Sequence, residues 1–81
     1  MVPQTEKRMR IQFDHSKLRG RIVELYGTNK VFATKINKTE QTVTAKLTGK
    51  SGFSQDDIVE WSDALNIENT DIGIFYFTLK V

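Results

Sequence analysis

The chain contains no cysteine, one histidine and no long apolar run among its 81 residues. Without cysteine it has neither a disulfide nor a thiolate metal site, which suits a reducing cytoplasm. No apolar stretch approaches the roughly 20 residues that a membrane-spanning helix needs. The start of the chain, MVPQTEKRMR, also lacks the apolar segment of a secretion signal. The sequence therefore predicts one small cytoplasmic domain with no membrane partner.

Groups that carry out catalysis are equally scarce. The single histidine, His15, stands at the start of a predicted helix with no second histidine or acid triad around it, so we expect a solvated side chain. Asp56 and Asp57 form an acid pair, but helix capping already explains Asp57. The sequence contains no glycine-rich phosphate loop and no metal-ligand spacing. We therefore expect a protein that is not an enzyme and that has no cofactor and no metal site.

Positive charge is concentrated in the first part of the chain, although the net charge is only +2. Residues 1–50 contain eleven Lys and Arg against four Asp and Glu, whereas residues 51–81 contain one Lys against six acids. A basic segment suits contact with a phosphate backbone. The alternative is an ordinary solvated surface whose charges are uneven along the sequence.

Four helices are predicted from the residues that begin and end them. Ser, Thr and Asp accept hydrogen bonds from the first N–H groups of a helix, and Gly and Asn tolerate the left-handed backbone at its end. In the fourth helix, Ser54 and Asp57 have the spacing of a capping box. The predicted caps and ends are Asp14 to Gly27, Thr28 to Asn37, Thr39 to Gly49 with a helix from Glu40 to Thr48, and a start at Ser54.

Apolar residues three and four positions apart predict the buried face of each helix. The side chains expected to face the core are Leu18, Ile22, Leu25, Tyr26, Val31, Phe32, Ile36, Val43, Leu47, Ile58, Trp61, Ser62 and Leu65. The aromatic tail after this last helix is ambiguous. Phe75, Phe77 and Leu79 alternate as in a strand, yet Phe75 and Leu79 also share a helical face, and Thr70 is a candidate cap for a single turn.

The chain divides into two parts. Residues 1–12 are predicted to be a flexible arm or an added extension, and Met9 is an alternative start. Residues 13–81 are predicted to form one domain, which includes the aromatic tail over residues 67–81.

The second and third predicted helices are joined by only about three residues, Asn37 to Thr39. A tight turn of this kind, after a helix with a small residue, is typical of a helix-turn-helix. The stretch FATKINKTEQTVTAKLTGK resembles the Cro and repressor helix-turn-helix family of bacteriophages, with the motif at about residues 28–49. The residues that match the family pattern are Ala33, Val43, Gly49 and Lys50. Two residues of the turn depart from it: Asn37 stands where the family has glycine, and Lys38 stands where it usually has an apolar residue.

The family resemblance implies which side chains meet a partner. In this family the second helix of the motif lies in the major groove, and its first residues contact base edges. The implied base or partner contacts are Glu40, Gln41, Thr44 and Ala45. The implied phosphate contacts are Thr28, Asn29, Lys30, Thr42, Lys46 and Lys50. Slim polar side chains suit a groove, since Gln41 can bond adenine N6 and N7 together. Glu40 would repel phosphate.

Three further stretches, FDHSKLRGRI, LTGKSGFSQDDIVEW and FYFT, resemble a family of small Cro-type regulators of Gram-positive phages. That family includes the modulator-of-repression proteins of temperate lactococcal phages. The resemblance implies a protein of the bacterial host cytoplasm that opposes or modifies the phage's own repressor in the switch between lysogeny and lytic growth. It implies binding to the cognate repressor, to operator DNA, or to both. The partner-protein candidates are Glu40, Gln41, Asp56, Asp57 and Glu60.

The predicted fold class is all-α. We expect a compact domain of four to five helices with a Cro/repressor-type helix-turn-helix and a short C-terminal extension. Two other functions stay open at this point: an autonomous DNA-binding homodimer with no repressor contact, and a purely protein-binding adaptor on the same fold. The sequence does not give the operator, the oligomeric state or the direction of regulation.

Overall fold

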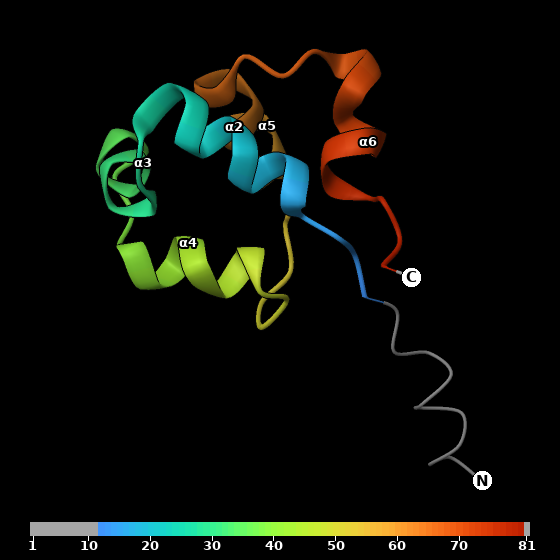
Figure 1. Ribbon diagram of the computed structural model, residues 1–81, viewed down its shortest axis with the longest axis horizontal. Coiled ribbons are helices and arrows are strands. Elements are labelled where there is room, and N and C mark those ends of the chain that lie inside the picture. Colours follow the sequence, from blue (N-terminus) through green and yellow to red (C-terminus); the bar gives the residue numbers. More distant parts are fainter. Residues whose placement is uncertain (1–11, 81) are drawn as a thin grey trace, which may run out of the picture.

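The computed structural model describes residues 12–80, and this part of the chain contains five α-helices and one 3-10 helix. In chain order they are α2 (Ser16–Tyr26), α3 (Asn29–Lys35), α4 (Glu40–Leu47), α5 (Gln55–Leu65), the 3-10 helix η1 (Asn69–Asp71) and α6 (Ile72–Tyr76). The helices α3 and α4 lie toward one end of the molecule and α6 toward the other, with α2 spanning the distance between them (Figure 1). The predicted all-α fold is confirmed. The predicted N-terminal arm covers residues 1–12, and its residues 1–11 lie outside the described part of the chain.

Hydroxyl side chains begin three of the helices, as the sequence predicts. Thr28 Oγ1 accepts a hydrogen bond from the backbone N–H of Val31 at 3.2 Å. Thr39 Oγ1 accepts one from the backbone N–H of Thr42 at 3.1 Å. The predicted capping box is present at the start of α5. These side chains satisfy N–H groups that have no partner within the first turn of a helix.

The start of α2 differs by one residue from the prediction. His15, and not Asp14, occupies the N-cap position. Asp14 Oδ1 accepts hydrogen bonds from the hydroxyl of Ser16 at 2.5 Å and from its backbone N–H at 2.9 Å. These two bonds hold the pKa of Asp14 below its usual value of 3.8. The carboxylate therefore caps the helix from one position further out.

Left-handed backbone ends the helices at the predicted residues. The φ angles are 84° at Gly27, 59° at Asn37 and 86° at Gly49. Glycine and asparagine adopt this region at the lowest cost. The helix α4 ends at Leu47, and Thr48, predicted to be its last residue, is its C-cap.

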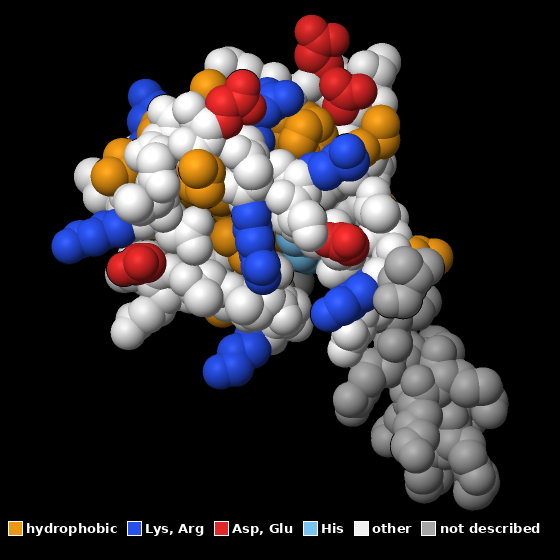
Figure 2. Space-filling view, in the orientation of Figure 1, with side chains coloured by type: hydrophobic (Ala, Val, Ile, Leu, Met, Phe, Trp, Pro, Cys, Tyr) orange, Lys and Arg blue, Asp and Glu red, His pale blue; other side chains and the backbone are white. Residues whose placement is uncertain are grey.

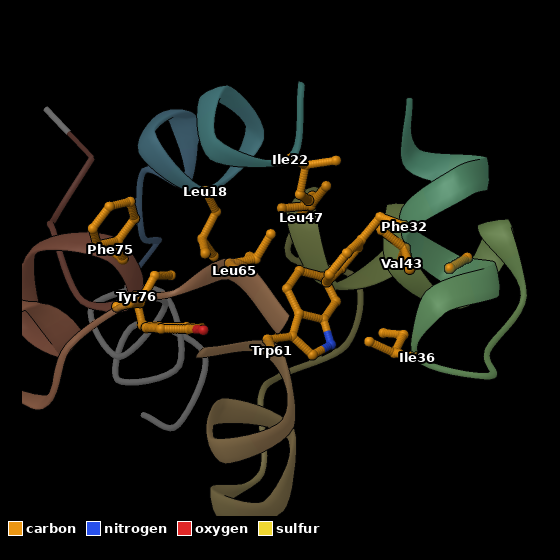
Figure 3. Close-up of a cluster of buried hydrophobic side chains, with 12 residues drawn as sticks. Leu18, Ile22, Phe32, Ile36, Val43, Leu47, Trp61, Leu65, Phe75 and Tyr76 are labelled. Atoms are coloured by element: carbon orange, nitrogen blue, oxygen red, sulfur yellow. The ribbon is translucent and has the colours of Figure 1, made fainter. Parts of the chain in front are cut away.

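Aromatic rings in edge-to-face contact form the centre of the core. The ring of Trp61 lies with its centroid 4.9 Å from those of both Phe32 and Phe53, and Phe53 lies 5.2 Å from Tyr76. Figure 3 shows Leu65 between the Trp61 and Phe32 pair and the ring of Tyr76. These contacts join α3, α5 and α6 into one body.

Two residues predicted to face the core are exposed. Val31 is 51% exposed and Leu25 is 42% exposed. The short helix α3 buries Phe32 and Ala33. Val31 lies one residue, or about 100°, before Phe32 and therefore points away from the core. Tyr26 and Ile58 are partly buried and pack against the core cluster.

The C-terminal tail combines both structures that its sequence suggests. The helix α6 ends at Tyr76, and Leu79 then forms an isolated antiparallel bridge with Phe13. Backbone hydrogen bonds of 2.7 Å from Asp14 N to Thr78 O and of 2.9 Å from Lys80 N to Gln12 O flank this bridge. Thr70 is not a cap, because Glu68 occupies the N-cap position of η1.

His15 is buried, which corrects the prediction of a solvated side chain. It is 8% exposed, and its Nδ1 and Nε2 atoms lie 3.4 Å from Leu47 O and 3.3 Å from Tyr76 O. The ring thus connects the end of α4 with the end of α6. The histidine is visible at the floor of a surface hollow of about 800 Å³ (Figure 2).

Candidate functional site

The turn between α3 and α4 holds the two helices in a fixed relation. The N–H of Asn37 donates to Thr34 O at 3.2 Å, and the N–H of Lys38 donates to Ala33 O at 2.8 Å. Ala33, the predicted small residue, is 2% exposed, and Val43 on α4 is fully buried. The helices therefore pack closely on one side and leave the other side of α4 at the surface.

The first turn of α4 presents slim polar side chains to solvent. Glu40, Gln41 and Thr44 are exposed, and Ala45 is partly buried. The structure thus places the four predicted base or partner contacts on the outer part of one short helix. The N-terminus of α4 also carries the positive end of the helix dipole. The exposed carboxylate of Glu40, amide of Gln41 and hydroxyl of Thr44 give this face both hydrogen-bond donors and acceptors.

The predicted phosphate contacts fall into two groups. Thr28, Lys30 and Lys50 are exposed, and Asn29 is partly buried. Thr42 and Lys46 are instead engaged within the chain. The hydroxyl of Thr42 lies 2.9 Å from that of Thr39, and Lys46 Nζ forms an ion pair of 2.8 Å with Asp57 Oδ2. The flank of α4 that carries Thr42 and Lys46 is therefore poorly suited to phosphate.

Asp57, a partner-protein candidate from the sequence, is also engaged within the chain. Burial alone would raise the pKa of its carboxyl, but the hydrogen bond from Lys46 and those from Ser54 outweigh burial and hold the pKa below 3.8. The carboxylate is consequently ionised and paired at neutral pH. The other acidic candidates, Asp56 and Glu60, lie on α5 outside this pair.

The outer face of α5 combines carboxylates with an apolar side chain. Asp56 and Asp63 are exposed, Glu60 is partly exposed, and Val59 between them is 69% exposed. Sequence reasoning missed Val59, although it is the apolar residue on the otherwise acidic face of that helix. Glu60 and Asp63 line a shallow hollow together with Asn37. The acidic face of α5 is therefore adjacent to the turn that leads into α4.

Positive and negative side chains are interspersed over the surface in Figure 2, with no continuous basic stripe on that face. Among residues 12–80, no group of three or more His, Cys, Asp or Glu side chains is placed to hold a metal ion. Within the same range, no helix is both long enough and apolar enough to cross a membrane. The candidate site consists of exposed or partly exposed residues of α4 and of the outer face of α5, here called the α4–α5 surface: Glu40, Gln41, Thr44, Asp56, Val59 and Glu60.

The family described as "Protein of unknown function (DUF739)" matches residues 11–79. The chain belongs to this family. No curated protein sequence matches the chain. A solved structure of the modulator of repression (MOR) of the temperate bacteriophage TP901-1 from Lactococcus lactis is similar, with a TM-score of 0.73 and 34% sequence identity. The similarity covers 80% of this chain and 88% of that one.

The predicted resemblance to modulator-of-repression proteins is therefore confirmed for this DUF739 protein. The similarity extends over sequence as well as fold, because the identity of 34% holds across most of both chains. It supports a regulatory role in a phage.

Proposed function

We propose that this DUF739 protein is a phage regulator of the modulator-of-repression type that binds the repressor of the same phage through the α4–α5 surface. It acts by binding and not by catalysis, in the cytoplasm of the bacterial host, and thereby changes the choice between lysogeny and lytic growth. The observation that carries the proposal is the exposed polar face of α4, which begins with the carboxylate of Glu40 and whose lysine, Lys46, is paired with Asp57.

The charge of this face favours a protein partner over DNA. Phosphate binding depends on cations that replace the counterions of the duplex. Lys46 is the single Lys or Arg within Glu40–Leu47, and its charge is already paired. A repressor must carry a basic DNA-binding surface, which Glu40 and the α5 acids complement in sign.

The α5 part of the surface adds an apolar contact with an acidic rim. Val59 is mostly exposed and is flanked by Asp56 and Glu60. An apolar contact surrounded by charges is the usual arrangement of a small interface, in which the rim charges set specificity and association rate. A basic protein surface with an apolar centre is the complementary partner.

The proposal is tested by mixing the purified protein with the repressor and measuring the mass of the complex by light scattering and its affinity by calorimetry. Glu40→Lys should weaken binding by at least about tenfold, since it places like charges together. Glu68→Lys makes the same charge change in an exposed residue next to η1 and should leave the affinity nearly unchanged. Absence of a complex, or equal effects of the two substitutions, would contradict the proposal.

A second candidate function is autonomous binding to operator DNA as a dimer. The observation in its favour is that Gln41 and Thr44 are exposed at the start of α4, with Lys30 and Lys50 also exposed. A dimer of this kind would read half-sites about 34 Å apart. Its affinity would fall steeply with salt, with a slope of about −0.9 in log Kobs against log salt for each phosphate contact. A flat salt dependence, or no binding by the protein alone, rejects this candidate.

A further inference from the structure

The ion pair between Lys46 and Asp57 removes the α4 lysine from the surface. Lys46 Nζ lies 2.8 Å from Asp57 Oδ2 and donates to Gly52 O at 2.9 Å. The ammonium also lies 5.8 Å from the centroid of the Phe53 ring. The side chains of Lys46 and Asp57 are only 12% and 18% exposed. Lys46 thus has three partners within the chain, whereas Lys30 and Lys50 are exposed.

Asp57 is the fixed member of this pair. Its Oδ2 atom accepts a hydrogen bond from the backbone N–H of Ser54 at 2.9 Å, and its own N–H donates to Ser54 Oγ at 3.0 Å. Phe53, just before the capping box, packs edge-to-face on Trp61 in the core. Because the capping box and the core hold Asp57 in place, it is the flexible lysine that turns toward the carboxylate.

The position of Lys46 is the one at which a groove-docked helix would need a cation. Lys46 follows Thr42 by four residues, so both lie on the same flank of α4. A helix that enters a groove has phosphates along its flanks. The pairing with Asp57 leaves this flank without an available positive charge.

We propose that Asp57 is a specificity-determining residue, which withholds Lys46 from phosphate and so keeps the α4 face for a protein partner instead of DNA. This inference rests on the proposed function in one respect: it takes the exposed face of α4 as the face that contacts the partner. Phosphate competes poorly for Lys46, because leaving the partly buried pair would strand the Asp57 carboxylate without its cation. Partner choice thereby depends on an ion pair within this chain.

The test compares wild type and variants in their binding to a DNA duplex of arbitrary sequence, measured by fluorescence anisotropy over a range of salt concentrations. The quantity compared is the slope of log Kobs against log salt concentration. Asp57→Asn keeps the size of the side chain and an acceptor for Ser54, but loses the charge that holds Lys46. Asp56→Asn removes the same charge from an exposed neighbour and is the matched control. We expect Asp57→Asn to strengthen binding several-fold at low salt and to steepen the slope by about 0.9, as for one added phosphate contact. Asp56→Asn should leave the slope unchanged.

Two further variants identify Lys46 as the cause. Adding Lys46→Gln to Asp57→Asn should return the slope to the wild-type value. Lys46→Gln alone leaves the capping box intact and should not change the slope, so it tests the proposal even if Asp57→Asn folds poorly. Equal slopes for Asp57→Asn and Asp56→Asn, or a shallower slope for Lys46→Gln alone, would overturn the proposal. A failure to bind repressor would contradict the proposed function. The DNA-binding measurements would still test the role of Asp57 independently.

Discussion

At the scale of single residues, the hydroxyls of Ser62 and Tyr76 form a buried pair. Their oxygens lie 2.9 Å apart, and the residues are 8% and 1% exposed. Burial raises the pKa of the Tyr76 phenol, and the hydrogen bond with Ser62 partly opposes that rise. The pair links α5 to α6, so it attaches the C-terminal part of the chain to the rest of the core.

The pair yields a prediction about stability. Tyr76→Phe should lower the free energy of unfolding by about 1–3 kcal/mol, because it leaves the Ser62 hydroxyl buried without a partner. The double substitution Ser62→Ala with Tyr76→Phe should cost less than the sum of the two single changes. Urea denaturation of all four proteins measures both effects. Strictly additive costs would mean that the two hydroxyls do not interact.

His15 and Lys46 illustrate what single residues do not reveal in the sequence. The partners of His15 are 32 and 61 positions away, and Lys46 is paired with an acid in the next helix. Periodicity and capping rules describe neighbours within about four positions. The burial of His15 and the pairing of Lys46 depend on how α4, α5 and α6 come together, which those local rules do not contain.

At the scale of elements, the turn before α4 depends on one residue in left-handed backbone. Asn37 has a φ of 59°. Asn37→Ala should lower the free energy of unfolding by about 1–2 kcal/mol, because an alanine side chain is strained in this region. Asn37→Gly should be nearly neutral and serves as the control. Thermal unfolding followed by circular dichroism measures both, and equal losses for the two variants would argue against backbone strain as the cause.

The start of α5 yields a prediction about pH. The folded pKa of Asp57 is lower than its value of 3.8 in the unfolded chain, so the carboxylate stabilises the fold fully above that value. This stabilisation is lost as the pH falls through the folded pKa. Asp57→Asn should therefore be less stable than wild type at pH 7, and the difference should shrink between about pH 5 and pH 2.

Chemical denaturation at several pH values measures that difference. Asp56→Asn is the control and should change the free energy of unfolding at pH 7 by less than about 0.5 kcal/mol, since Asp56 is exposed and outside the capping box. A difference between wild type and Asp57→Asn that stays constant down to pH 2 would contradict the assignment of the stabilisation to the ionised carboxylate.

The elements themselves were largely predictable because caps and turns are local. Thr28, Thr39 and Ser54 begin helices as expected, and Gly27 and Asn37 end them. The structure of the tail was less predictable, because the same apolar residues fit both the alternating pattern of a strand and the spacing of a helix. In the structure, the residues that pack on the core form the helix α6, and Leu79 beyond it forms an extended bridge with Phe13.

At the scale of the whole molecule, three cations from the basic half of the sequence, Arg19, Arg21 and Lys46, contact other helices within residues 12–80. Arg19 donates to Leu47 O at 3.3 Å, and Arg21 donates to Leu65 O at 2.7 Å. The guanidinium of Arg21 also lies 5.1 Å from the Phe75 ring centroid. Together with Lys46, which pairs with Asp57, these cations connect one helix to another. Charge counting along the sequence could not reveal this, because their partners lie in other parts of the chain.

The most direct test of repressor docking is the mobility of a duplex carrying the repressor's operator, measured with this protein alone, with the repressor alone and with both. If the α4–α5 surface docks on the repressor, this protein alone should not change the mobility of the duplex. At the same concentration it should change the mobility of the repressor–duplex band, either by abolishing that band or by retarding it further. A shift by this protein alone, together with an unchanged repressor band in the mixture, would contradict the account.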